Sequence, residues 1–156
     1  GLVSGRQYWH DVIGYNYRMT NIQAAIGCAQ LESSDKILEQ KRALAHYYMD
    51  HFQNTEISWQ KESDDVLHSY WMFNVIMDID INQRNTMMDK LNEKGIETRP
   101  LFYPIHTMPI YYKKNEIHPV CEKINSTGFS IPSYPELNTN QLDYIADSIK
   151  EALNGV

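Results

Sequence analysis

SYWMFNVIMDI, residues 69–79, is dense in aromatic and β-branched side chains. An extended chain with this sequence would be apolar on both faces, which is typical of a strand that is covered on both sides. Such a strand needs neighbouring strands in a sheet and helices packed against it. We therefore expect residues 69–79 to form the central strand of a sheet.

Segments with other patterns lie on both sides of this stretch. Apolar residues recur at helical spacing in several of them, most regularly toward the end of the chain. We expect helices over residues 20–31, 35–52, about 82–94, 118–126 and 139–153, and short strands over residues 57–59, 96–101 and 129–131. This alternation predicts an α/β fold in which helices cover a small mixed sheet.

Local signals mark the ends of two of these helices. Thr20 and Gln23 stand at capping-box spacing, where each side chain can bond the other's backbone N–H group. Asn82 or Asn85 can cap the next helix of this kind, and Gly95 stands where a left-handed C-terminal cap is expected.

The composition excludes several classes of protein. The chain has 156 residues, with 20 acidic and 14 basic side chains and a formal net charge of -6. Without a run of lysines or arginines, a nucleic-acid partner is not expected. Neither Cys28 nor Cys121 has metal-ligand spacing, and no apolar run approaches the roughly 20 residues that cross a bilayer. We expect a cytoplasmic protein with no metal site and no membrane partner, and, since it opens with Gly1, a piece of a longer one.

Two segments carry side chains that are unusual for pure scaffold. In Tyr8–Thr20, YWHDVIGYNYRMT, aromatic residues, His10, Asn16 and Arg18 precede a capped helix, whose N-terminus favours anions. Asn16 and Arg18 could therefore face a phosphate. The alternative is that Asn16 serves a turn and Arg18 pairs with a surface carboxylate.

The second segment is the proline-rich loop over residues 99–111. Its prolines hold Arg99, Tyr103 and His106 at low entropic cost, so these side chains could line a polar substrate pocket. His106 could equally be a packing residue. The chain contains no Gly-rich phosphate loop and no recognisable catalytic set, so these patterns alone indicate only a soluble α/β domain.

Three segments in order resemble one enzyme family. GYNYRMTNIQAAIGCAQLE (14–32), GIETRPLFYPIHTMPIY (95–111) and FSIPSYPELNTNQLDYIADSIKEAL (129–153) resemble the DegT/DnrJ/EryC1/StrS family of sugar aminotransferases. YWHDVI, just before the first of them, is similar to the perosamine synthase branch. The resemblance implies a fold-type-I enzyme that uses pyridoxal phosphate, works as a homodimer, and transfers an amino group from glutamate to a nucleotide-linked 4-keto sugar.

The resemblance also implies roles for individual residues. Residues 1–32 would be the tail of the large cofactor domain with a subunit-contact segment, and residues 33–156 would be the small C-terminal domain. Asn16 and Arg18 would lie at the cofactor, with Asn16 reaching its phosphate across the dimer. The resemblance also implies that His10, Arg99, Tyr103 and His106 would lie on the substrate side.

The family's cofactor lysine lies upstream of the GYNYR motif and is not in these residues. No catalytic residue is therefore expected within the chain, and the chain by itself should be inactive, because pyridoxal phosphate needs groups that bind and orient it. The alternative is a noncatalytic α/β binding or regulatory domain with the aromatic N-terminal segment as a docking arm.

Overall fold

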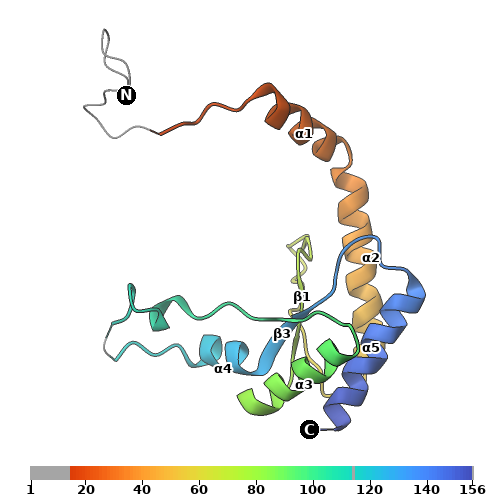
Figure 1. Cartoon of the computed structure of the whole chain (residues 1–156), viewed down its shortest axis with the longest axis vertical. Coiled ribbons are helices and arrows are strands. Elements are labelled where there is room, and N and C mark those ends of the chain that lie inside the picture. Colours follow the sequence, from red (N-terminus) through yellow and green to blue (C-terminus); the bar gives the residue numbers. More distant parts are fainter. Residues whose placement is uncertain (1–14, 114, 156) are drawn as a thin grey trace. The chain divides into compact units, whose positions relative to one another are not determined.

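The computed structural model describes residues 15–113 and 115–155 and divides into two compact units, with the boundary between Asp35 and Lys36 (Figure 1). Among the described residues, no helix combines the length and apolar character that crossing a bilayer requires.

The first unit contains helix α1 (Asn21–Glu32). Its capping box is present as predicted: Thr20 Oγ1 accepts from the Gln23 N–H group at 3.3 Å, and Gln23 Oε1 accepts from the Thr20 N–H group at 2.9 Å. No residue of α1 is buried within the described chain, and Ile22, Ile26 and Leu31 are 60–75% exposed. The apolar side chains of α1 are therefore not used for packing within the part of the chain that the structure describes.

A three-stranded sheet organises the second unit. Its strands β1 (Phe73–Ile76), β2 (Arg99–Pro100) and β3 (Gly128–Ile131) lie in the order β1-β3-β2. The expected strand over residues 69–79 is thus shorter and lies at an edge, while β3 is central. An apolar run indicates that its side chains are buried, but it does not indicate where the strand lies in its sheet. The expected strand at 57–59 is reduced to a single bridge between Ser58 and Ile76.

The sheet is antiparallel throughout, whereas the helix-strand alternation predicted a mixed sheet. The segment after β2 runs outward as a loop, and helix α4 (Pro119–Thr127) leads the chain back (Figure 1). The chain thus leaves the end of β2 and returns to the same place. β3 therefore begins beside the end of β2 and runs in the opposite direction. Gly128 permits this close approach, since a Cβ atom there would lie 2.8 Å from Leu101 Cδ1 and 3.0 Å from Val75 O.

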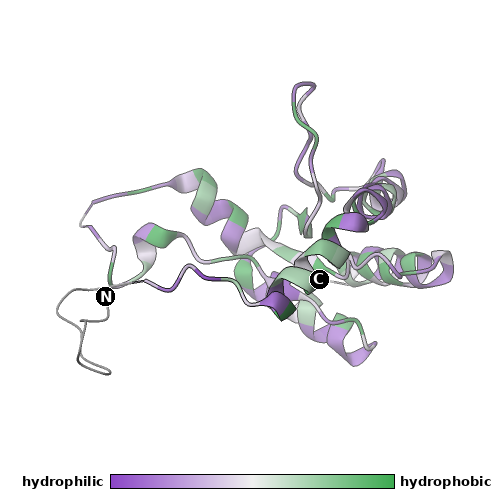
Figure 2. Ribbon diagram, turned by 90° about the horizontal axis from the view of Figure 1, so that it is seen from above, coloured by the Kyte–Doolittle hydropathy of each residue, from purple (hydrophilic) through white to green (hydrophobic). Residues whose placement is uncertain are grey.

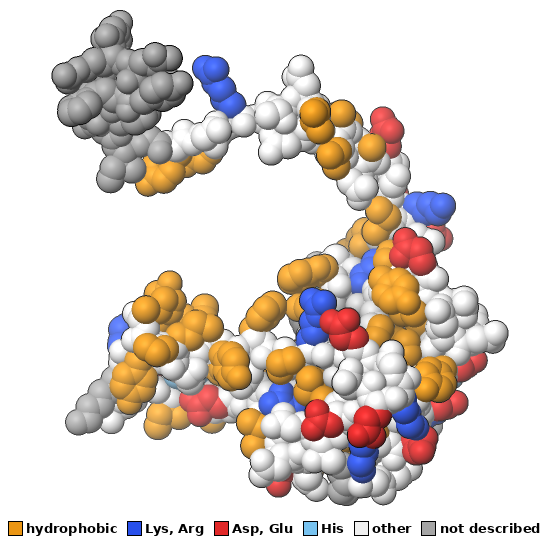
Figure 3. Space-filling model, viewed as in Figure 1, with side chains coloured by type: hydrophobic (Ala, Val, Ile, Leu, Met, Phe, Trp, Pro, Cys, Tyr) orange, Lys and Arg blue, Asp and Glu red, His pale blue; other side chains and the backbone are white. Residues whose placement is uncertain are grey.

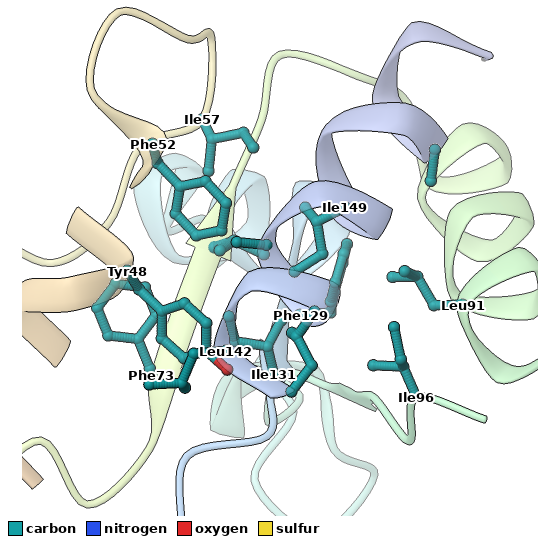
Figure 4. Close-up of a cluster of buried hydrophobic side chains, with 14 of the residues drawn as sticks. Tyr48, Phe52, Ile57, Phe73, Leu91, Ile96, Phe129, Ile131, Leu142 and Ile149 are labelled. Carbon is teal, nitrogen blue, oxygen red and sulfur yellow. The ribbon is translucent and has the colours of Figure 1, made fainter. Parts of the chain in front are cut away.

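One face of the sheet forms the core. Phe73, Val75, Phe129 and Ile131 alternate along β1 and β3 and are at most 4% exposed. Helices α2 (Ser34–Phe52), α3 (Ile81–Glu93) and α5 (Thr139–Asn154) supply the other side of this core. Figure 4 shows their side chains meeting those of the strands, among them Tyr48, Phe52, Leu91, Leu142 and Ile149. The hydropathy colouring of Figure 2 shows hydrophilic and hydrophobic bands along these helices, as expected of amphipathic helices.

The start of α3 differs from the prediction, and its end agrees with the prediction. Its N-cap is Asp80, whose Oδ1 accepts from the Asn82 and Gln83 N–H groups at 2.7 and 2.9 Å. Asn82 and Asn85 were therefore the wrong candidates, because the helix begins at Ile81 and both asparagines lie inside it. Gly95 has φ 76°, and the N–H groups of Gly95 and Ile96 bond Asn92 O and Leu91 O, which is a Schellman motif.

Candidate functional site

The segment Tyr15–Thr20 leads directly into α1. Tyr15 and Tyr17 stack with their ring centroids 5.8 Å apart, and both rings are exposed. Between and after them, Asn16 Oδ1 accepts from the Arg18 N–H group at 3.1 Å, which fixes a local turn. The amide of Asn16 and the guanidinium of Arg18 are hydrogen-bond donors just ahead of a helix N-terminus, a combination that suits an anion.

The candidate site residues fall in different parts of the chain. Asn16 and Arg18 belong to the first unit, and Arg99, Tyr103 and His106 belong to the second. His10 lies outside the described residues. Arg99, Tyr103 and His106 are near one another in the sequence, and each has its own surroundings in the structure.

Arg99 lies in β2 with its side chain 76% exposed, and its guanidinium contacts Glu97 Oε1 at 3.1 Å. The register places Arg99 opposite Ser130, and Ser130 opposite Asn74 on the far side of β3. These three side chains share the sheet face that is opposite the hydrophobic core. Ser130 Oγ donates to Asn74 Oδ1 at 2.7 Å. A polar row thus crosses the sheet from β1 to β2.

Sequence reasoning missed Asn74 and Ser130. Each is the polar residue at an alternating position within a short apolar strand, FNVI and GFSI. That alternation was the available signal, but only the strand order shows that the two residues are neighbours of Arg99.

Tyr103 and His106 have different surroundings in the loop that follows β2. Tyr103 is 68% exposed. His106 lies in a 3-10 turn, η1 (Ile105–Thr107), where its side chain is only 11% exposed and its Nε2 lies 2.8 Å from Glu122 Oε1. Within this loop, Tyr103 is thus open to a ligand and His106 is held against α4.

An open groove of about 510 Å³ lies between this loop and α4. Its walls are mostly apolar, and they are formed by Leu101, Phe102, Ile117, His118, Pro119, Val120, Cys121, Ile124 and Asn125. Figure 3 shows hydrophobic side chains gathered over the same loop and helix. The exposed hydrophobic side chains of this loop and of α4 include Phe102, Tyr103, Ile105, Ile110, Tyr111 and Val120.

Glu122 and Lys41 are among the charged side chains whose pKa values are shifted. The pKa of Glu122 is lowered, first by its bond from His106 and then by the His118 N–H group. The pKa of Lys41 is lowered because burial disfavours its charged form. Lys41 Nζ donates to Trp71 O at 2.9 Å, and to Ser133 O, so it joins the loops before β1 and after β3. Over the described ranges, no three His, Cys, Asp or Glu side chains are placed to hold a metal ion.

Comparison with known proteins gives one family and a consistent set of relatives. Residues 1–150 match the model of the DegT/DnrJ/EryC1/StrS aminotransferase family. The chain is 48% identical over 151 residues to a GDP-perosamine synthase of Escherichia coli O157:H7, covering 97% of this chain and 41% of that protein. A GDP-perosamine synthase of Vibrio cholerae is 41% identical, covering 99% of this chain and 43% of that protein.

The fold has relatives among solved structures. PseC of Helicobacter pylori, an aminotransferase involved in the biosynthesis of pseudoaminic acid, superimposes with a TM-score of 0.84 at 18% identity, covering 97% of this chain and 43% of that chain. At this identity the likeness concerns the fold alone. The chain spans about two fifths of the length of the curated relatives it matches.

Proposed function

Because this chain belongs to the DegT/DnrJ/EryC1/StrS aminotransferase family, we propose that it is the C-terminal part of a pyridoxal-phosphate-dependent aminotransferase acting on a nucleotide-linked keto-sugar. The observation that carries the proposal is the 48% identity to a GDP-perosamine synthase across 97% of the chain. On this basis the amino donor is glutamate and the acceptor is a GDP-linked 4-keto sugar.

The two parts of the chain have separate tasks in this proposal. Residues 1–32 form the end of the large cofactor domain and contact a second subunit, so the protein is a homodimer. Residues 33–156 form the small domain that closes over the substrate. The reacting lysine is on the remaining part of the protein, and the chain by itself does not catalyse the transfer.

Asn16 and Arg18 hold the cofactor phosphate in this proposal. Both are exposed, both offer N–H donors, and both precede the positive end of α1. These features fit a phosphate group. The cofactor itself, when bound, supplies an electron sink that stabilises negative charge on the substrate carbon.

We assign Arg99 and Tyr103 to contact with the substrate, His106 to the same side of the site without a substrate contact of its own, and His10 to the site that two subunits share. An exposed guanidinium suits the diphosphate of a sugar nucleotide, because its planar fork can donate two parallel hydrogen bonds. The exposed Tyr103 ring can pack on a sugar or a base and donate through its hydroxyl group.

The proposal is tested with the full-length protein and three reactants: pyridoxal phosphate, glutamate and a GDP-linked 4-keto sugar. Glutamate-dependent formation of the amino sugar is the expected result. Asn16→Ala should weaken pyridoxal phosphate binding about tenfold through loss of a hydrogen bond to a charged group. Asn16→Asp should weaken it further, because its carboxylate repels the phosphate. No amination by the wild-type protein with any nucleotide-linked keto-sugar would contradict the proposal.

A further inference from the structure

The His106 ring is already bonded within the protein. Its side chain is 11% exposed, and its Nε2 lies 2.8 Å from Glu122 Oε1. An imidazole N–H group can donate to a carboxylate in the neutral and in the protonated state. A ring so enclosed is better placed to hold the loop than to meet a ligand.

Glu122 joins three pieces of structure through one carboxylate oxygen. Besides His106, its Oε1 accepts from the backbone N–H group of His118 at 3.1 Å, at the start of α4. The same side chain therefore fixes η1, the end of the returning loop and the first turn of the helix. Bonds to an ionised acceptor are about twice as strong as neutral ones.

A second, neutral contact holds the beginning of the loop. Asn125, also on α4, donates through Nδ2 to Leu101 O at 2.9 Å and to Phe102 O at 3.1 Å. Tyr103 follows directly after these two residues and precedes His106 by three. The backbone that carries the exposed Tyr103 ring is thus fixed to α4 on both sides.

We propose that Glu122 is a positioning residue for the substrate side of the site: through His106 it holds the loop that presents Tyr103, and His106 itself does not contact the substrate. This inference rests on the proposed function. It assigns a role to a residue sixteen positions from His106 that no sequence pattern connects with it.

The contact depends on pH through the groups around it. His118 packs its ring against that of His106, with centroids 4.6 Å apart, and its Nε2 contacts Glu116 Oε1 at 3.1 Å. Among the described residues, Lys113 is a nearby cation that lowers the pKa of Glu116. Since the pKa of Glu122 is lowered, its carboxylate keeps its charge in mildly acidic solution, and the contact weakens only when the pH falls through that lowered pKa.

The test uses full-length protein with Glu122→Ala, Glu122→Gln and Asn125→Ala, and with Glu136→Gln as a control at an exposed carboxylate away from the loop. Hydrogen exchange of peptides covering residues 104–112 measures directly how firmly Glu122 holds the loop. Steady-state kinetics with the GDP-linked 4-keto sugar measures its consequence. The exchange arm does not depend on whether the protein aminates this sugar, so it separates a failure of this inference from a failure of the proposed function.

Glu122→Ala should speed exchange in residues 104–112 about tenfold and raise KM for the sugar nucleotide about tenfold, with kcat changed less than about threefold. Glu122→Gln keeps an acceptor and should recover most of both, and its exchange should lose the acid dependence of the wild-type protein. Asn125→Ala should speed exchange at all pH values. Unchanged exchange in Glu122→Ala would show that Glu122 does not hold the loop. Faster exchange with an unchanged KM would overturn the positioning role.

Discussion

At the scale of single residues, Glu62 is the most strongly perturbed carboxylate of the described chain. Its two oxygens accept from Arg42 at 2.7 and 3.0 Å, and Oε1 also accepts from the His68 N–H group at 2.6 Å. The Arg42 bond, followed by that of His68, lowers the pKa of Glu62 to about 2. The pair ties the loop between α2 and β1 to α2.

Glu62 therefore makes stability depend on pH in a defined window. Its folded pKa lies below the ordinary value of 4.5, so its contribution is fully present above about 4.5 and is lost as the pH falls toward 2. Glu62→Gln should lower the free energy of unfolding at pH 7 and flatten its fall between these pH values. Urea unfolding at a series of pH values measures this, with Glu93→Gln on α3 as the control. Parallel pH curves for Glu62→Gln and the wild-type protein would refute the assignment.

At the scale of secondary-structure elements, the caps determine where helices begin. Asp80→Ala should lower the free energy of unfolding by about 1 kcal/mol, because two N–H groups at the start of α3 lose their acceptor. Asn85→Ala, at an exposed position inside the same helix, should change it by less than about 0.5 kcal/mol. Thermal unfolding of the two variants distinguishes them, and an equal loss in both would show that Asp80 is not the functional cap.

Elements with local signals could be predicted from the sequence, and those without could not. The capping box of α1, the Gly95 turn and the helical spacing of apolar residues in α5 all depend on residues within one or two turns of each other. The central position of β3 and the antiparallel pairing depend on residues far apart in the chain. The local spacing of apolar residues does not determine such pairing. The expected mixed sheet and the expected central position of residues 69–79 were therefore wrong.

The same distinction applies to the candidate site. Arg99, Tyr103 and His106 lie in one proline-rich segment, so composition alone marks them as candidates. Ser130 and Asn74 join Arg99 only through strand register, and Glu122 joins His106 only because the loop folds back on α4. These partners required the tertiary structure.

At the scale of the whole molecule, the described chain exposes many large apolar side chains. Ile22 and Ile26 on α1 and the aromatic side chains of the loop before α4 are exposed. Large exposed apolar patches mark interaction surfaces. This is what our proposal requires of a small domain and a subunit-contact segment that work against the rest of a larger enzyme.

The location of the lysine that binds the cofactor tests this account most directly. Full-length protein is incubated with pyridoxal phosphate, reduced with borohydride and digested, and the modified peptide is identified by mass spectrometry. We expect one stoichiometrically modified lysine, outside these 156 residues and N-terminal to the Tyr15–Arg18 segment. Stoichiometric modification of a lysine within the chain, with the half-buried Lys41 as the first candidate because its pKa is lowered, or the absence of any modified lysine, would contradict the account.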